Sequence, residues 1–270
     1  MIRLEKICKT FVHGGGDRVV ALDAVDVFIP EGEFVTVIGT NGSGKSTFLN
    51  AIAGKFICDS GKIILDGKDV TNQPEYKRAG LLGRVFQDPF TGTSPGMTIF
   101  ENLRIAMLRG MPRRLKLGLS ESERNRYYDE LKKLEMHLEE RLNATVGLLS
   151  GGQRQALTLL MATIRKPKIL LLDEHTAALD PKAAEQIVRL TKKIVGENHL
   201  TTVMITHSMT QALDLGSRTI MMHKGAVIGD FSGDERKRMK PVDLLNRFNE
   251  LRKQELMDEE LVSMLQEGYY

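Results

Sequence analysis

The sequence has little cysteine and no long apolar run, and each of these absences excludes a class of protein. Its two cysteines, Cys8 and Cys58, have neither the spacing of a metal site nor the number that a disulfide-stapled secreted domain needs. They fit a reducing compartment, where buried free thiols are ordinary. No apolar stretch approaches the roughly 20 residues of a membrane-spanning helix, so any work at a membrane would depend on a partner.

A strong excess of charge of one sign is also absent. The net charge of +3 is spread over 38 basic and 35 acidic side chains, so we expect no nucleic-acid partner. The first residues, MIRLEKICKTF, carry too much charge for a signal peptide. A length of 270 residues with 41% hydrophobic residues is enough to bury one α/β core, with a smaller lobe attached.

Apolar periodicity predicts strand and helix alternation on both sides of a helical insertion. The continuous apolar run 34–38 is typical of a buried parallel strand, and the Asp66-Gly67 turn predicts a hairpin over 60–70. Further strands are expected at 18–29, 168–173, 201–206 and 219–223, and helices at 48–53, 181–196 and 209–215. This alternation favours a wound parallel sheet.

The middle of the chain, from about 98 to 142, is charged and has helical periodicity. Ser120 and Glu123 form the pattern of a capping box, which predicts a helix that runs to about Glu135. We therefore expect a helical subdomain inserted into the sheet domain.

A glycine-rich loop follows the strand at 34–38 and opens the next helix. Its sequence matches G-x-x-x-x-G-K-[ST] at Gly39, Thr40, Asn41, Gly42, Ser43, Gly44, Lys45, Ser46 and Thr47. The glycines let backbone N–H groups turn toward phosphates, and the helix N-terminus adds positive potential. Lys45 is expected to reach the terminal phosphates, Ser46 to offer its hydroxyl to Mg²⁺, and Thr47 to bind an α-phosphate. This loop predicts a nucleotide site.

Two adjacent acids end the apolar strand 168–173, at the strand edge where open α/β sheets bind ligands. Asp173 is expected to hold Mg²⁺ through a water. Glu174 is expected to orient the water that attacks the γ-phosphate and to accept its proton, because phosphoryl transfer depends on positioning and charge neutralisation.

A second glycine pair stands at the start of another apolar helix. It follows Ser150, an expected N-cap, and consists of Gly151 and Gly152, with Gln153 next. This LSGGQ segment, placed shortly before the acid strand, resembles the signature motif of the ATP-binding cassette (ABC) ATPases. The resemblance covers roughly residues 2–230.

The resemblance extends to four further positions. Gln87 resembles the Q-loop glutamine, which contacts Mg²⁺ and the attacking water, and Asp180 lies in a segment that resembles the D-loop. His207 resembles the histidine that contacts the γ-phosphate and supports Glu174. Phe11 resembles the aromatic residue that stacks on adenine, although a core or loop aromatic is the competing interpretation.

Two segments differ from the sequence that is common in this family. His175 stands where a proline is usual, and we interpret it as a packing substitution or a residue that tunes the site from behind Glu174. The segment Thr145–Leu148 lacks the His-Gln stretch of many sugar and metal importers, which makes those relatives less similar.

The resemblance implies a RecA-like P-loop NTPase core with an antiparallel β subdomain and an inserted α-helical subdomain. The ABC domain would cover 1–230, with its core at 1–90 and 155–230 and its helical part at about 91–154. A helical extension, 231–270, would follow, with Leu244, Leu245, Phe248 and Leu251 on one face that packs on the core or contacts a partner.

The resemblance also implies how the protein works. ATP and Mg²⁺ would lie between the phosphate loop of one copy and Ser150 of a second copy in a head-to-tail homodimer. This dimer would sit on the cytoplasmic face of the membrane as a peripheral ATPase. It would dock membrane permease subunits near Gln87 and Phe90.

Several functions remain open on the sequence alone. The segments GQRQALTLLMAT and DEHTAALDP resemble an importer group that is served by an external substrate-binding protein, some members of which are linked to aromatic amino acids. A soluble ABC protein that acts on ribosomes or nucleic acid is one alternative. A membrane motor without classical transport, such as one for lipoprotein release, is the other.

Overall fold

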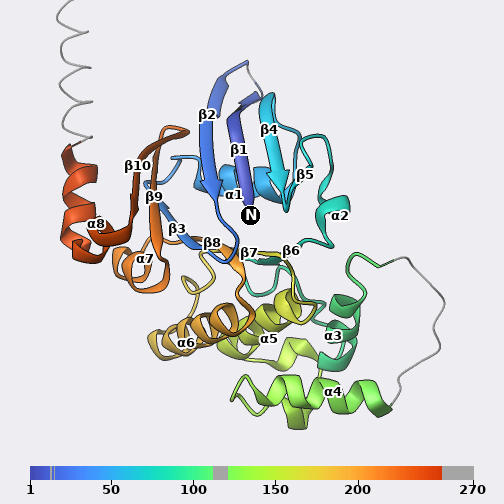
Figure 1. Ribbon diagram of the computed structural model, residues 1–270. Coiled ribbons are helices and arrows are strands. Elements are labelled where there is room, and N and C mark those ends of the chain that lie inside the picture. The colour runs from blue at the N-terminus through green and yellow to red at the C-terminus, as the bar shows by residue number, and fades with distance from the viewer. Residues whose placement is uncertain (13, 15, 112–120, 251–270) are drawn as a thin grey trace, which may run out of the picture.

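The computed structural model describes residues 1–12, 14, 16–111 and 121–250. Within these residues, six strands form a mainly parallel sheet in the order β10-β9-β3-β8-β7-β6, with β10 antiparallel at one edge (Figure 1). Their bounds are Phe34–Gly39 for β3, Leu82–Val85 for β6, Ile169–Asp173 for β7, Thr201–Ile205 for β8, Arg218–His223 for β9 and Ala226–Ser232 for β10. The central strands β3 and β8 are buried throughout, as a sheet covered on both faces requires.

An antiparallel sheet covers one face of this central sheet. Its order is β2-β1-β4-β5, with bounds Ile2–Val12 for β1, Arg18–Ile29 for β2, Ser60–Leu65 for β4 and Lys68–Asp69 for β5. Helix α1, Lys45–Ala53, lies between the two sheets and buries Phe48 and Leu49 in the apolar cluster that they share. The helix ends at Gly54, which caps it in the left-handed conformation with φ 80°.

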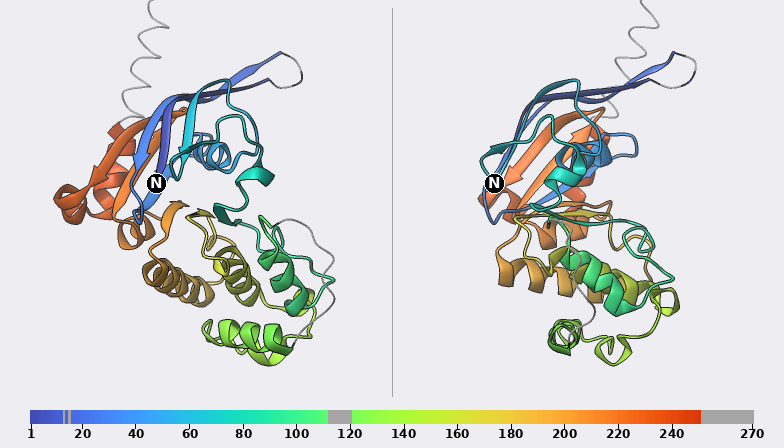
Figure 2. Two further views of the ribbon diagram at one scale, coloured as in Figure 1. Left: turned by 45° about the vertical axis from the view of Figure 1, so that its right-hand side comes forward. Right: turned by 90° about the vertical axis from the view of Figure 1, so that its right-hand side faces the viewer.

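Helices cover the opposite face of the central sheet (Figure 2). Their bounds are Ile99–Met107 for α3, Glu121–Lys132 for α4, Gly151–Thr163 for α5 and Pro181–Asn198 for α6, with short 3-10 turns at Glu139–Arg141 and Val146–Leu148. A four-residue helix, α2, spans Glu75–Arg78. Side chains alternate between the two faces along β7: Ile169 and Leu171 contact the α1 side, whereas Leu170 and Leu172 contact α5 and α6. The two clusters hold the layers together.

A third apolar cluster joins the C-terminal part to the sheet. Helices α7, Met209–Leu215, and α8, Gly233–Arg238, lie near the β9–β10 edge, and residues 241–250 are also helical. Leu244 and Phe248 are buried against Phe231 and Ile38, which confirms that this part packs on the core. No helix among the described residues combines the length and apolar character of a bilayer crossing.

Several sequence predictions need correction or fall outside the described residues. Leu245 is 50% exposed, so it does not share the buried face of Leu244 and Phe248. The helix expected to reach Glu135 ends at Lys132, because Glu135 and His137 adopt left-handed backbone angles that end it. Ser120 and Leu251 lie outside the described residues. Strands β1, β6 and β10 were not predicted by range; β6 is only four residues long.

Candidate nucleotide site

The loops that carry the predicted residues meet at one edge of the central sheet. Strands β3, β8, β7 and β6 run parallel, and their pairing aligns Val37 with Ile205, Ile205 with Asp173, and Leu172 with Val85. Since the carboxyl ends of parallel strands lie at the same edge, the four loops that follow them are neighbours. These loops carry Lys45, His207, Glu174 and Gln87 respectively.

The phosphate loop has a backbone that only glycine tolerates at its turn into α1. Gly44 has φ 96°, and a Cβ there would lie 2.4 Å from the carbonyl oxygen of Ala21. No side chain caps the N-terminus of α1, so its first amides are available to a ligand. The Ser43 hydroxyl is buried without a hydrogen-bond partner. Both features fit a loop that encloses phosphate.

Lys45 lies inside this loop. Its ammonium donates hydrogen bonds to the carbonyl oxygens of Gly39 and Thr40, each at 2.8 Å. Burial lowers the pKa of Lys45, while the negative charges of Glu174 and Asp173 oppose that shift. The phosphate loop and the acid strand lie at the same edge of the sheet, because β3 and β7 both pair in parallel with β8.

Glu174 and His207 meet directly. The His207 Nε2 atom lies 2.6 Å from Oε1 of Glu174, and the Glu174 backbone N–H donates to the carbonyl of Ile205 on β8. Glu174 has φ 45°, an unfavourable angle for a residue with a side chain. Such strain, of order 1–3 kcal/mol, persists where the surrounding structure holds a residue in a working position.

Asp173 has a partner that the sequence analysis missed. Nη2 of Arg84, on β6, lies 3.3 Å from Oδ2 of Asp173 and 2.7 Å from Oδ1 of Asn50 on α1. An arginine within an otherwise apolar strand was the available signal, because a buried charge needs a partner.

The predicted metal residues offer only oxygen ligands. They are the Ser46 hydroxyl, the Asp173 carboxylate and the Gln87 side-chain amide, and Asp173 and Ser46 are not fully buried. The described residues contain no group of three or more His, Cys, Asp or Glu side chains suited to a metal. A site with one carboxylate, a hydroxyl and substrate phosphates fits Mg²⁺, which keeps waters and uses few protein ligands.

The second glycine segment caps helix α5 by itself. The Ser150 hydroxyl accepts from the Gln153 N–H at 3.3 Å, and the Gln153 side chain accepts from the Ser150 N–H at 3.3 Å. Ser150 and Gly151 are exposed, whereas Gly152 is buried against α6, where its added Cβ would lie 2.9 Å from Cβ of Ala183. The structure confirms Ser150 as the predicted N-cap.

The remaining predicted residues have different surroundings. Gln87 is exposed after β6, and the carbonyl of the preceding Phe86 accepts a hydrogen bond from Gln155 on α5. Asp180 caps α6 by accepting from the Ala183 N–H at 3.0 Å. Phe11 lies on β1, and its ring meets that of Phe56 edge-on, with centroids 5.4 Å apart.

His175 is fully enclosed behind the acid strand. Its Nε2 lies 3.0 Å from the hydroxyl of Thr191 on α6, and burial lowers its pKa to about 4. The side chain is therefore neutral at neutral pH, and its contact joins the segment after Glu174 to α6.

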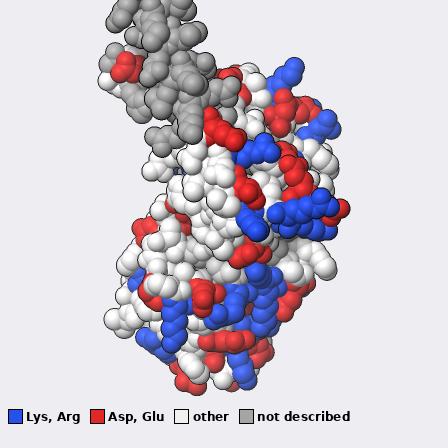
Figure 3. Space-filling view, turned by 90° about the vertical axis from the view of Figure 1, so that its left-hand side faces the viewer, with Lys and Arg blue, Asp and Glu red and all other residues white. Residues whose placement is uncertain are grey.

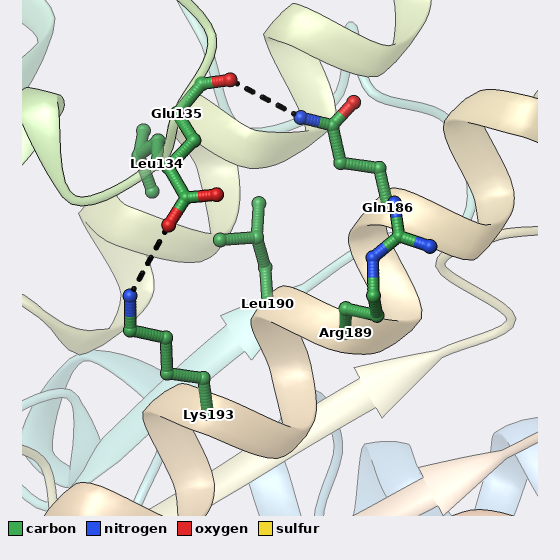
Figure 4. A pocket seen from close by; sticks show the side chains of 6 residues that line it. All are labelled: Leu134, Glu135, Gln186, Arg189, Leu190 and Lys193. Carbon is green, nitrogen blue, oxygen red and sulfur yellow. Dashed lines mark hydrogen bonds and ion pairs between the residues drawn. The ribbon is translucent and has the colours of Figure 1, made fainter.

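A separate pocket lies away from these loops (Figure 4). It has a volume of about 250 Å³ and is lined by Leu134, Glu135, Gln186, Arg189, Leu190 and Lys193. The carbonyl of Glu135 accepts from Gln186 at 3.3 Å, and its carboxylate pairs with Lys193 at 3.5 Å. None of the predicted site residues lines it.

One face of the molecule shows Lys/Arg and Asp/Glu side chains interspersed, without a large field of one sign (Figure 3).

Comparisons with known proteins agree with this geometry. The sequence model of a family described as ABC transporter matches residues 22–177. A tyrosine transport ATP-binding protein of Clostridioides difficile is 43% identical over 248 residues, which cover 92% of this chain and 98% of that protein. A spermidine/putrescine import ATP-binding protein, PotA, of Haemophilus influenzae is 35% identical over 87% of this chain, but the match spans only 59% of PotA.

A solved structure is similar over most of its length. It is a dimeric ATP-binding cassette in a post-hydrolysis state, bound to ADP and Pi. Its TM-score is 0.74 at 32% identity, and the match covers 86% of this chain and 98% of that one.

Proposed function

The chain belongs to the ABC transporter family, as one of its ATP-binding and ATP-hydrolysing subunits, and from this premise we propose that it drives uptake of an aromatic amino acid through a membrane permease. The observation that carries the motor role is the juxtaposition of Glu174 and His207, 2.6 Å apart, beside the phosphate loop. The cargo rests on the 43% identity to a protein named for tyrosine transport. Both relatives are named for transport or import, which favours transport over lipoprotein release.

We propose the following roles in ATP hydrolysis. The amides of the phosphate loop and the Lys45 ammonium hold the phosphates, with Ser46 and Thr47 at their flank. Glu174 orients the attacking water and accepts its proton, and His207 holds the Glu174 carboxylate and contacts the γ-phosphate. Gln87 contacts the same water from the neighbouring loop, and Phe11 stacks on adenine.

Mg²⁺ would be held by Ser46, by Asp173 through a water, and by Gln87. When bound, it would neutralise charge that develops on the phosphate oxygens. Oδ2 of Asp173 accepts a hydrogen bond from Arg84, so Oδ1 remains for the water that would join Asp173 to the metal.

We propose that two copies assemble head to tail, with one copy's Ser150 at the partner's ATP. The exposed Ser150, Gly151 and Asp180 support this arrangement, because they present polar groups at the surface. The similar cassette solved as a dimer with ADP and Pi is consistent with it. A monomer would leave the γ-phosphate half surrounded by water, and the site incompletely organised.

The proposed domain division places the permease contact between core and helical part. The core would cover 1–90 and 155–230, the helical subdomain about 91–154 and the extension 231–270. Phe90 is 56% exposed, and the guanidinium of Arg154 lies 3.7 Å from its ring, so a large apolar side chain is presented beside Gln87. We propose that a cytoplasmic helix of the permease docks here, which places the protein peripherally on the cytoplasmic face.

Reconstitution tests the proposed function. The tagged chain is purified with its permease, placed in liposomes with ATP on the side of the ATPase, and supplied with the external binding protein and tyrosine on the other side. Tyrosine should accumulate on the ATP side, and hydrolysis should rise when loaded binding protein is added, because cargo arrival favours the closed dimer. Cargo leaving the ATP side, or hydrolysis indifferent to any binding protein, would contradict import.

A further inference from the structure

Arg84 is a buried cation next to the acid strand, and neither the phosphate loop nor the signature segment accounts for it. It lies on β6 in register with Leu171 of β7, so its side chain reaches along the neighbouring strand toward that strand's carboxyl end. Its side chain is 10% exposed, and that of Asp173 is 16% exposed. The ion pair is therefore largely shielded from water, where screening is weak.

The guanidinium is held from two sides. Nη2 is 2.7 Å from Oδ1 of Asn50 and 3.3 Å from Oδ2 of Asp173, and the group lies 4.6 Å from the centroid of the Phe86 ring. Its Nε is buried without a hydrogen-bond partner. Asn50 belongs to α1, the helix that begins at the phosphate loop, and Phe86 precedes Gln87. Arg84 thus connects three parts of the nucleotide site.

The contact also distinguishes the two carboxylate oxygens of Asp173 by their partners. Oδ2 accepts from Arg84, so Oδ1 remains for other ligands. Carboxylates that serve a metal are usually held by hydrogen bonds of this kind, and loss of such a partner typically weakens metal binding by 10- to 100-fold.

We propose that Arg84, anchored by Asn50, is a positioning residue that sets the orientation of Asp173 for the Mg²⁺ that accompanies ATP. This inference rests on the proposed role of Asp173 at the metal. It predicts that Arg84 acts on metal binding separately from nucleotide binding, because the phosphates are proposed to be held by the phosphate loop and Lys45, whereas the hydrogen bonds, ion pair and ring contact of Arg84 go to Asn50, Asp173 and Phe86.

The competing interpretation is that Arg84 only joins β6 to α1. Arg78 offers a matched control, since it is a fully buried arginine that donates to the carbonyls of Ala51 and Ile52 on the same helix and has no ion pair with a carboxylate among the described residues. A purely structural arginine should change thermal stability without changing the Mg²⁺ requirement.

The experiment measures ADP affinity by calorimetry in EDTA and then at rising Mg²⁺. It compares the full chain with Arg84→Met, which keeps the length of the side chain, Arg84→Lys, which keeps the charge, and the Arg78→Lys control. Mn²⁺ bound together with ADP is followed by electron paramagnetic resonance as a second readout.

For both Arg84 variants we expect ADP affinity in EDTA to change by less than about 3-fold, and the Mg²⁺ needed for half-saturation to rise by about 10- to 100-fold. Arg84→Lys should lose less than Arg84→Met, because a lysine keeps a positive charge that can pair with Asp173 but lacks the planar guanidinium that lies over the Phe86 ring. The Arg78→Lys control should leave the Mg²⁺ requirement unchanged.

Two results would overturn the proposal. One is an unchanged Mg²⁺ requirement in both Arg84 variants; the other is tighter Mg²⁺ binding in Arg84→Met, which would show that Arg84 opposes the metal by charge. The Asp173→Asn variant distinguishes the role of Arg84 from the role of Asp173 at the metal. If it also leaves the Mg²⁺ requirement unchanged, Asp173 is not a metal residue and the proposed site fails; if it raises the requirement while Arg84 variants do not, only the role of Arg84 fails.

Discussion

Helices α1 and α5 both begin at glycine-rich segments, yet their N-termini are prepared differently. At α1 the N-cap is Gly44 in a left-handed conformation, and no side chain occupies the first amides. At α5, Ser150 and Gln153 form a capping box in which each accepts a hydrogen bond from the other's backbone. The first terminus has no side-chain cap, whereas at the second the capping box satisfies the N–H groups of Ser150 and Gln153.

This difference indicates which of the two helix N-termini can bind a phosphate without a partner subunit. A phosphate at α1 has no side-chain cap to displace, and it meets the Lys45 ammonium, which donates to the carbonyls of Gly39 and Thr40 in the same loop. At α5 the Ser150 hydroxyl already accepts from the Gln153 N–H, a cap of a kind that contributes about 1 kcal/mol to a helix, so a phosphate that used either group would compete with the cap. The comparison therefore supports a primary site at α1 and a secondary one at α5 that engages only when a partner brings ATP to it.

The largest expected effect is that of a substitution at the N-terminus of α1, which has no side-chain cap. Lys45→Ala removes a cation from the phosphates, and hydrogen bonds that involve a charged group contribute about 1.5–3 kcal/mol each, so nucleotide affinity should fall by roughly 100-fold or more. Calorimetry with ATP checks this. The exposed Lys55→Ala serves as the control and should bind normally. Unchanged affinity in Lys45→Ala would contradict the assignment of this loop.

The second prediction separates binding at α1 from closure onto α5. Glu174→Gln keeps the shape of the side chain and removes the base, so hydrolysis should fall by at least ~10²-fold while ATP binding is kept. Size exclusion should then show an ATP-dependent dimer. The exposed Glu197→Gln on α6 should behave like the unaltered protein. Turnover near the normal rate in Glu174→Gln would show that Glu174 is not the base.

The third prediction concerns the capped terminus directly. In a dimer of one Ser150→Arg protomer and one Lys45→Ala protomer, one composite site carries both lesions and the other carries neither. The mixture should hydrolyse ATP measurably faster than either homodimer, because the intact site remains. Activity no higher than that of the homodimers would contradict independent sites completed by Ser150 of the partner.

The smallest expected effect concerns the support beneath the capped terminus. Gly152 of α5 rests on α6, and His175 joins α6 to the acid strand through Thr191. The His175 pKa is about 4 in the folded chain, below its ordinary value of 6.5. The unfolded chain therefore binds more protons between these values, and stability should fall as the pH drops from 6.5 to 4, by at most about 1.4 kcal/mol per pH unit.

Urea unfolding across this pH range measures that dependence. His175→Leu should show a shallower loss of stability than the unaltered chain, although its stability at pH 7 is lower because the Thr191 contact is gone. The exposed His137→Asn should keep the original slope. Equal slopes for His175→Leu and the unaltered chain would show that His175 is accessible to protons in the folded state.

Much of the site was predictable because its signals are local. The phosphate loop, the N-cap at Ser150 and the paired acids each depend on residues adjacent in the chain. The alternation of strands and helices along residues 168–223 also followed from apolar periodicity. The end of helix α4 at Lys132 was not predictable, because the residues with left-handed backbone angles that follow it, Glu135 and His137, are not glycines.

The sequence by itself identified this protein as one of the ABC ATPases, predicted a nucleotide site at its glycine loop and predicted a fold around a parallel sheet. Only the tertiary structure decided that Arg84 pairs with Asp173, 89 positions away in the chain, that His175 faces Thr191, and that Leu245 points outward while Leu244 is buried. The physical reason is the separation along the chain between the residues that interact. Caps, turns and glycine loops depend on neighbours within a few residues, whereas side-chain partners across strands and helices depend on how those elements are ordered and packed against one another.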